Sequence, residues 1–186
     1  QFYRVSVDNH FPYRLYGGQQ DNTSVRLDSR NLNGGSIGPE AMTASAGGES
    51  AFLAFDPDDP QLVMGGSYLG TINVLDTKTG ASVNIMAAPI QYLALDAKDM
   101  RYRFNWNAPI IRSQHDKNVW YHAAQVILRT HDLGTTWEEA SPDLTRNEKS
   151  KQGKGGGPYT NESVGAESYG TISYLIESPH EAGVLW

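Results

Sequence analysis

Short apolar runs alternate with short polar turns along the whole chain. The recurring unit is an apolar strand, a polar turn and a second apolar strand that ends in small residues. Runs of this length bounded by turn residues are typical of β-strands, and no stretch shows a helical period. The pattern therefore predicts an all-β protein.

The unit occurs four times, which indicates an internal repeat. The copies span residues 5–18, 52–66, 110–124 and 172–186. Aligned on the first residue of the turn, they are 48, 57 and 65 residues apart, and these first residues are Asp8, Asp56, Ser113 and Ser178. Because four-stranded propeller blades are about 40–50 residues long, the spacing predicts a β-propeller with loop insertions.

The repeat divides the chain into four-stranded antiparallel blades at about 1–46, 47–100, 101–160 and 161–186. In the second blade we expect strands at 51–55, 62–66, 71–75 and 81–86, and in the third at 125–130 and 136–140 after its first pair. About three and a half blades do not close a ring. We therefore expect the chain to be part of one propeller domain whose remaining blades lie in the same protein or another chain.

Composition narrows the function classes. Lys and Arg total 15 against 21 for Asp and Glu, so the net charge is −6, which argues against nucleic acid as a partner. No apolar stretch is long enough to span a membrane. The absence of cysteine excludes disulfides and thiolate chemistry. The five histidines match no metal-ligand pattern, and no Gly-rich phosphate loop occurs, so we expect neither a metal nor a cofactor.

One motif is specific. Residues 130–137 read Thr-His-Asp-Leu-Gly-Thr-Thr-Trp, which matches the Asp-box pattern Ser/Thr-x-Asp-x-Gly-x-Thr-Trp. Thr130 and Asp132 are expected to bond to the backbone of a tight turn, Gly134 to adopt a positive φ, and Trp137 to fill the space between sheets. We interpret these residues as structural. Residues 76–80 form a degenerate copy.

With this motif the chain resembles the Asp-box propellers, which include bacterial neuraminidase repeats, xyloglucan-hydrolysing propellers and the sortilin ectodomain. Residues 16–22, 47–50, 102–110 and 141–145 are similar to exported bacterial proteins of the sortilin-like, glycosyl-hydrolase-like group. The resemblance covers essentially the whole chain. It implies a propeller fold, a secreted, periplasmic or cell-surface location, and a carbohydrate or peptide ligand.

Strand direction sorts the loops into two ends. In a four-stranded meander, the turn between strands one and two lies at the same end as the turn between strands three and four. The Asp box is therefore expected beside 56–60 and 178–181, at what we call the turn end. The opposite, entry end collects the segments that lead into each first strand or follow each second strand, which are 17–22, 47–50, 65–70, 102–107, 123–125 and 161–169.

Polar and aromatic residues of the entry end are the candidate site. Glu49 and Asp21 are the candidate catalytic residues, because glycoside hydrolysis uses two carboxyl groups. The candidate ligand-binding residues are Trp106, Arg103, Asn105, Tyr68, Glu162 and Glu167. Structural alternatives stay open for most of them: loop capping for Asp21, charge pairing for Glu49 and Arg103, core packing for Trp106, and solvation for Glu162 and Glu167. His122 lies beside this end, where core packing is the alternative to a site role.

Two function classes remain open. The first is a glycosidase-like propeller that acts on or binds an extracellular carbohydrate, with carboxyl groups about 5–5.5 Å apart for retention or about 6.5–9.5 Å for inversion. The second is a sortilin-like propeller that binds a peptide or protein without catalysis. Facing acids beside an aromatic platform would favour hydrolysis. A peptide-lined channel without such a pair would favour binding.

Overall fold

A computed structural model describes residues 1–90, 95–153 and 168–186. Within these ranges the protein is all-β, with three four-stranded antiparallel sheets, as the alternation of short apolar runs predicts. The only helical elements of the described ranges are single 3-10 turns, namely η1 (Pro39–Ala41), η2 (Tyr68–Gly70), η3 (Ala97–Asp99) and η4 (Lys149–Lys151). None of these short turns approaches the length of an apolar helix that could cross a membrane.

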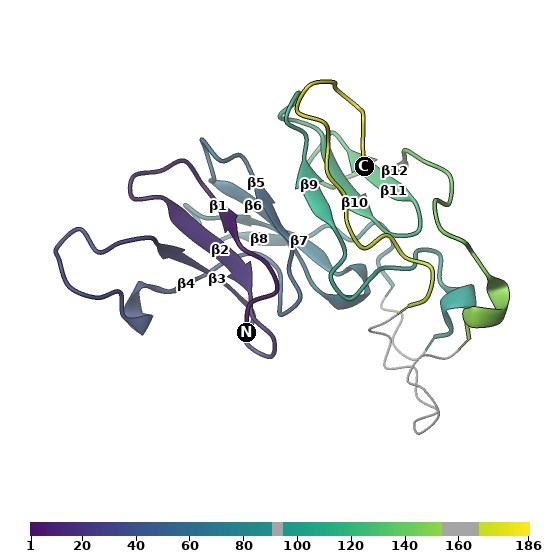
Figure 1. Cartoon of the computed structure of the whole chain (residues 1–186), viewed down its shortest axis with the longest axis horizontal. Coiled ribbons are helices and arrows are strands. Elements are labelled where there is room, and N and C mark those ends of the chain that lie inside the picture. The colour runs from purple at the N-terminus through teal and green to yellow at the C-terminus, as the bar shows by residue number, and fades with distance from the viewer. Residues whose placement is uncertain (91–94, 154–167) are drawn as a thin grey trace.

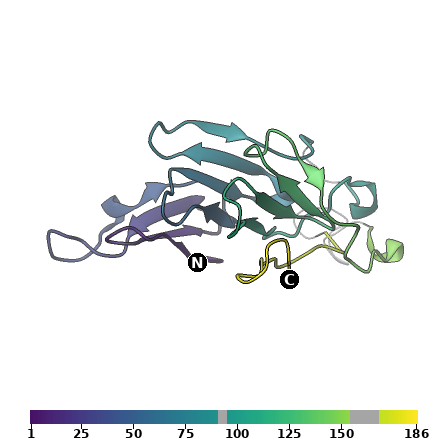
Figure 2. The same cartoon turned by 90° about the horizontal axis from the view of Figure 1, so that it is seen from above.

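Each sheet is a meander of four strands that follow one another along the chain (Figure 1). The first contains β1 (Ser6–Val7), β2 (Arg14–Gly18), β3 (Ser24–Asp28) and β4 (Thr43–Ala44). The second contains β5 (Leu53–Phe55), β6 (Leu62–Gly66), β7 (Ile72–Asp76) and β8 (Ser82–Asn84). The third contains β9 (Ile110–Arg112), β10 (Trp120–Ala123), β11 (Ile127–Thr130) and β12 (Glu138–Glu139). The long connection between β3 and β4 extends away from the rest of the molecule in both views (Figure 2).

The last segment forms a hairpin beside the third sheet. Glu177 pairs with Leu185 in an antiparallel bridge, and Ile176 and Trp186 exchange both of their backbone hydrogen bonds at 2.9 Å. In Figure 1 this segment, coloured yellow, runs alongside β9 and β10. Leu175 packs into an apolar cluster with residues of β10 and β11. The fourth copy of the repeat therefore has the same first hairpin as the other three.

The turn after the first strand is built alike in all four copies. In each, the side-chain oxygen of the first turn residue accepts a hydrogen bond from the backbone N–H two positions later. The pairs are Asp8 with His10 (3.2 Å), Asp56 with Asp58 (3.1 Å), Ser113 with His115 (3.1 Å) and Ser178 with His180 (3.2 Å). Asp and Ser both supply an acceptor at this position, so one local structure tolerates either residue.

β5 of the second sheet is buried on both faces, and its successive side chains point to opposite sides. Phe52 and Ala54 share a core with Trp120 of the third sheet. Leu53 and Phe55 share a different core with Tyr16 of the first sheet, among others. Each sheet is therefore held against its neighbour by an apolar layer, and burial of these layers is the main force that orders the sheets side by side.

Glycines at the ends of β2 and β6 let the chain pass very close. A Cβ at Gly65 would lie 2.3 Å from the carbonyl carbon of Ala46, and one at Gly18 would lie 2.7 Å from the nitrogen of Ala51. Any larger residue would push this segment away. The segment that leads into β5 is thus held directly over the ends of β2 and β6, and Glu49 lies on it.

Candidate functional site

At the turn end, the turns of neighbouring repeats touch one another. Asn9 Nδ2 donates to Asp58 Oδ1 at 2.7 Å, joining the first and second repeats. Arg112 and Asp56 form an ion pair at 2.9 Å between the second and third. His115 Nε2 lies 2.7 Å from the Ser178 carbonyl oxygen, between the third and fourth. Polar groups at this end are therefore largely committed to contacts between repeats.

At the entry end, the side-chain amide of Gln20 is hydrogen-bonded to the carboxylates of Asp21 and Glu49. Gln20 Nε2 donates to Glu49 Oε2 at 3.0 Å and to Asp21 Oδ1 at 3.1 Å. The backbone N–H of Asp21 also donates to Glu49 Oε2 at 3.0 Å, and the φ of Asp21 is 62°, in the left-handed region that Asp tolerates. Neither carboxylate forms an ion pair with a cationic side chain in the described ranges.

Aromatic rings continue the same network. Trp106 Nε1 donates to the Tyr3 hydroxyl at 2.9 Å, and that hydroxyl donates to Gln20 Oε1. The indole ring of Trp106 also stacks on the ring of Tyr68. We call these six residues the entry-end cluster: Tyr3, Gln20, Asp21, Glu49, Tyr68 and Trp106. All six are partly or fully exposed.

Residues of all three sheets contribute to the entry-end cluster. Gln20 follows β2, Glu49 precedes β5 and Trp106 precedes β9, so the cluster exists only when the sheets are docked. Such a surface offers ring faces for stacking and carboxylate oxygens that accept hydroxyl or amine protons. Sequence analysis did not select Tyr3 or Gln20. Tyr3 joins through the pairing of Phe2 with Gln19, which no sequence motif indicates.

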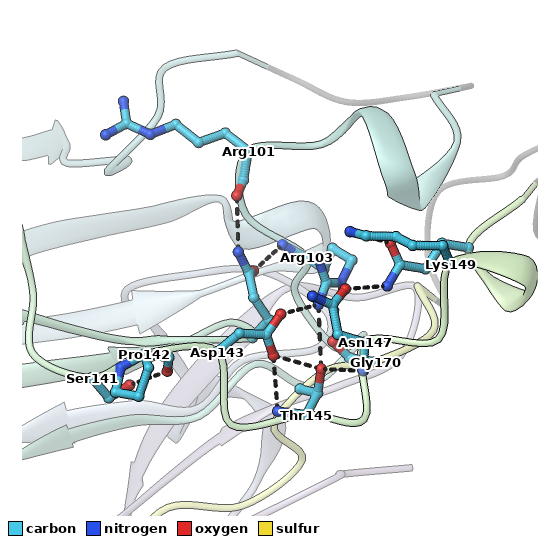
Figure 3. A network of polar contacts seen from close by, with 11 residues as sticks. Arg101, Arg103, Ser141, Pro142, Asp143, Thr145, Asn147, Lys149 and Gly170 are labelled. Atoms are coloured by element: carbon cyan, nitrogen blue, oxygen red, sulfur yellow. Dashed lines mark hydrogen bonds and ion pairs between the residues drawn. The ribbon is translucent and has the colours of Figure 1, made fainter.

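Arg103 lies elsewhere, in a buried polar network (Figure 3). Its guanidinium donates to Asp143 at 2.8 Å, to Thr145 at 3.3 Å and to the Gly170 carbonyl at 3.2 Å. Burial works to raise the pKa of Asp143, but hydrogen bonds from Thr145 and Arg103 outweigh it and lower that pKa. The side chain is only 5% exposed, and its Nε and Nη2 are both hydrogen-bonded, so Arg103 fixes the 143–145 loop against residue 170.

Asn105 also takes no part in the entry-end cluster. Asn105 Nδ2 donates to the Thr171 hydroxyl at 3.2 Å, and its Oδ1 accepts the backbone N–H of Asn107 at 3.1 Å. These bonds shape the loop that carries Trp106. Glu162 and Glu167 lie outside the described residues.

His122 is fully buried. Its ring stacks on Phe104 with centroids 4.6 Å apart, and its Nδ1 lies 3.0 Å from the Pro109 carbonyl oxygen. Burial lowers the pKa of His122 to about 4, although the backbone carbonyls of Pro109 and Gly70 work in the opposite direction. The imidazole is therefore neutral at pH 7 and packs as a core ring. Among the residues that the structure describes, no group of three or more acidic or histidine side chains could hold a metal.

The turn between β11 and β12 is closed by side chains. Asp132 Oδ1 accepts hydrogen bonds from the Thr136 backbone N–H and the Thr130 hydroxyl, both at 2.8 Å. Hydrogen bonds from Thr136, and then from Thr130, lower the pKa of Asp132. Gly134 has a φ of 83° and donates its N–H to the Thr130 hydroxyl at 2.9 Å. The Asp132 carboxylate and the hydroxyls of Thr130 and Thr136 thus form hydrogen bonds within the turn itself.

Trp137 follows this turn and joins two sheets. Its Nε1 donates to the Ile85 carbonyl oxygen at 2.7 Å, just after β8 of the second sheet. Its ring packs against two apolar clusters, the core between the second and third sheets and the cluster around Phe104 and Leu128. The side chain is half-buried, so it covers the outer edge of this interface.

The first strands line an apolar groove of about 580 Å³, which we call the inner groove. Its walls come from β1, β5, β9 and residues 174–176. The guanidinium of Arg4 lies between two rings, 4.1 Å from the Phe52 centroid and 5.1 Å from the Tyr174 centroid. No carboxylate of the described ranges pairs with it.

Comparison with protein-family models finds no match to this chain, and comparison with curated protein sequences finds no significant relative.

Proposed function

We propose that the three sheets are blades of a β-propeller and that the entry-end cluster binds an extracellular carbohydrate. One observation carries the proposal: a continuous hydrogen-bonded chain runs from Trp106 through Tyr3 and Gln20 to Glu49. It fixes an aromatic face beside two carboxylates that have no cationic partner among the described residues. Sugars present an apolar ring face and a rim of hydroxyls, and this surface is complementary to both.

Three features support the propeller arrangement. Each sheet is a four-stranded meander whose first strand lines the inner groove. Each neighbouring pair of sheets shares an apolar core. The turn after the first strand is repeated four times with one hydrogen-bond pattern. The turn at 130–137 has the contacts expected of an Asp box. The proposed extracellular location rests on the resemblance to exported Asp-box propellers.

The carboxylate geometry favours binding over hydrolysis. Asp21 and Glu49 each place an oxygen within 3.1 Å of the same Gln20 nitrogen, so these oxygens are closer than the roughly 6.5 Å that an inverting pair requires. The Gln20 amide also occupies the space between them. Hydrolysis by this pair would therefore have to be of the retaining type and would require Gln20 to move aside.

A specific observation favours the second candidate function, peptide binding. The inner groove is lined mainly by apolar side chains, and Arg4 offers its guanidinium there without a carboxylate partner in the described ranges. An extended apolar peptide with an acidic group would satisfy both features. In this reading the protein is a sortilin-like binding propeller without catalysis, and the ligand lies in the inner groove.

A polysaccharide panel tests the first proposal. Binding to immobilised polysaccharides and release of reducing sugar are measured for the wild-type protein, Trp106→Ala and Glu49→Gln. The control is Glu181→Gln, an exposed carboxylate at the turn end. We expect binding that both entry-end variants weaken and the control retains. Binding that is equal in all four proteins would contradict the assignment to the entry-end cluster.

The wild-type protein, Glu49→Gln and one further variant, Arg4→Gln, test the alternative. A clean negative across the polysaccharide panel, together with binding of acidic apolar peptides, would favour the second function. Arg4→Gln should then weaken peptide binding while Glu49→Gln leaves it unchanged. An affinity for the peptide that is the same in Arg4→Gln and in the wild type would exclude the inner groove as the binding site.

A further inference from the structure

The proposed function leaves open which sugar the entry-end cluster binds, and the charges of the cluster limit the choice. The donors that hold its two carboxylates are the Gln20 amide and the Asp21 backbone N–H. Both donors are neutral, so neither cancels the charge of Asp21 or Glu49. The other oxygens of these carboxylates, Asp21 Oδ2 and Glu49 Oε1, accept no hydrogen bond from the described residues. Asp21 is exposed and Glu49 is partly exposed, so both residues are open to solvent.

The aromatic rings of the cluster also lack a cation. Other rings of the protein, such as those of Phe52 and Tyr102, lie close to an arginine guanidinium. Within the described ranges, no Arg or Lys lies over the rings of Tyr3, Tyr68 or Trp106. The face of an aromatic ring carries partial negative charge and attracts a cation. Two kinds of group that bind cations therefore meet at one surface, and neither is paired with a cation of the described chain.

A bound sugar increases the cost of leaving these charges unpaired. In water, the two carboxylates beside the Gln20 amide repel each other weakly, because the solvent has a high dielectric constant. A sugar that packs against Trp106 displaces part of this water, so the repulsion grows. Hydroxyl groups can donate hydrogen bonds to the carboxylates but leave the charge in place, whereas an ammonium group supplies hydrogen bonds and the opposite charge together. The cluster therefore favours a sugar that carries a positive charge.

We propose that the entry-end cluster binds an amino sugar with a free amino group, whose ammonium donates hydrogen bonds to Asp21 and Glu49. Three hydrogen bonds and the Gln20 amide connect the Trp106 nitrogen to Glu49, a span that adjoining units of a sugar chain can cover. One unit then packs against the exposed part of the indole while the ammonium lies at the carboxylates. This inference rests on the proposed function and specifies the sugar of that same site.

Three oligosaccharides that differ in one substituent on each ring test the charge. Oligomers of glucosamine, N-acetylglucosamine and glucose with the same length and linkage carry an ammonium, an acetamide and a hydroxyl group at this position. Isothermal titration calorimetry is carried out below the pKa of the amine, so that the amine is protonated. We expect the glucosamine oligomer to bind about tenfold more tightly than either neutral oligomer, which corresponds to about 1.4 kcal/mol. Added salt should weaken the binding of the glucosamine oligomer alone.

Failure of this inference is distinguishable from failure of the proposed function. Equal affinity for the three oligomers, or tighter binding of a neutral one, overturns the amino-sugar inference and leaves carbohydrate binding intact. A glucosamine oligomer that does not bind also overturns the inference. The proposed function itself fails only when no member of the polysaccharide panel binds.

Charge variants locate the preference for the ammonium. Glu49→Gln and Asp21→Asn each remove one charge and keep an oxygen that can accept the hydrogen bond from Gln20. Each should lower the affinity for the glucosamine oligomer by a larger factor than the affinity for the glucose oligomer, and Glu181→Gln is the matched control. If both charge variants leave the ratio of these two affinities unchanged, the ammonium does not bind at these carboxylates and the inference is wrong.

An amine without a sugar ring separates an amino sugar from a basic peptide. The amide of N-acetyl-lysine carries the same charge on a flexible chain and is titrated into the wild type and Trp106→Ala. We expect it to bind more weakly than the glucosamine oligomer, whereas Trp106→Ala should weaken all three oligomers by a similar factor because packing on the indole does not depend on the charge. A lysine derivative that binds as tightly as the glucosamine oligomer, and equally in both proteins, would overturn the inference in favour of a basic side chain.

Discussion

The indole of Trp106 lies parallel to the phenol ring of Tyr68, with ring centroids 5.3 Å apart and planes 6° from parallel. Tyr68 belongs to η2, which follows β6, and Trp106 leads into β9. The two rings therefore come from neighbouring sheets and meet only at the entry end. Because Trp106 also bonds to Tyr3, its orientation is fixed by contacts in two directions.

The Trp106 ring is expected to supply stacking energy to a bound sugar. Trp106→Ala should weaken carbohydrate binding about five- to tenfold, since an aromatic contact contributes about 1 kcal/mol. Trp106→Phe should weaken binding less, because it keeps an aromatic ring, although a smaller one without the bond to Tyr3. Isothermal titration calorimetry with a sugar that the wild type binds measures both. Equal affinity for the wild type and Trp106→Ala would mean that the indole does not contact the ligand.

We expect substitutions at the entry end to change ligand affinity and substitutions at the turn end to change stability. Glu49→Gln is expected to lower ligand affinity with little change in melting temperature, because the side chain is partly exposed and keeps an oxygen for Gln20. Asp132→Ala should lower the melting temperature without changing affinity, since it leaves the donors of Thr130 and Thr136 without their acceptor. Thermal unfolding and ligand titration of both variants check this pair. The reverse pattern would show that the two ends have been assigned the wrong roles.

Trp137 should contribute to stability through both its ring and its donor. Trp137→Ala is expected to lower the free energy of unfolding by about 2–3 kcal/mol, below the range for a fully buried aromatic residue because the side chain is half-buried. Trp137→Phe should cost about 1 kcal/mol, mainly the hydrogen bond to the Ile85 carbonyl. Urea unfolding gives both values. An alanine variant as stable as the wild type would rule out a role at this interface.

Acid should weaken the fold through His122. The folded pKa is about 4, below the ordinary value of 6.5, so the folded protein resists protonation that the unfolded chain accepts. This contribution is complete above pH 6.5, falls as the pH drops from 6.5 to 4, and falls no further below 4. Its total size is about 3 kcal/mol, at about 1.4 kcal/mol per pH unit.

The histidine contribution is isolated by difference. Unfolding free energies of the wild type and His122→Gln are compared at pH 7 and pH 5, where all other titrating groups are common to both proteins. The wild type should lose more stability between these two pH values than the variant does. The same loss in both proteins would show that His122 does not titrate as its burial implies.

The Arg103–Asp143 pair should be strongly coupled. Arg103→Gln is expected to cost about 2–3 kcal/mol, because it leaves Asp143 in a site where only 25% of its side chain is exposed. The double variant Arg103→Gln/Asp143→Asn should recover part of that loss by removing the stranded charge. Chemical denaturation of the two single variants and the double variant completes a mutant cycle. Strictly additive effects would mean that the ion pair contributes nothing by itself.

Local features of this protein follow directly from its sequence. The alternation of short apolar runs with turn residues predicts β-strands, and β6 begins and ends at the expected 62–66. The repeated turns are also local, because an Asp or Ser oxygen needs only to reach a backbone N–H two residues away. The glycines that end β2 and β6 likewise mark places where another segment passes closely, although the sequence does not say which segment.

Tertiary structure alone decided which long-range partners each polar side chain found. Arg103 and Trp106 are three residues apart in one loop, yet one is buried against Asp143 and the other is partly exposed beside Tyr68. Tyr3 and Gln20, which complete the entry-end cluster, flank β1 and β2 of the first sheet and lie in no recognisable sequence motif. Hydrogen bonds of this kind depend on the angle and distance between docked sheets. A strand's own pattern of apolar and polar residues fixes which face is buried, but it carries no information about what the neighbouring sheet brings to that face.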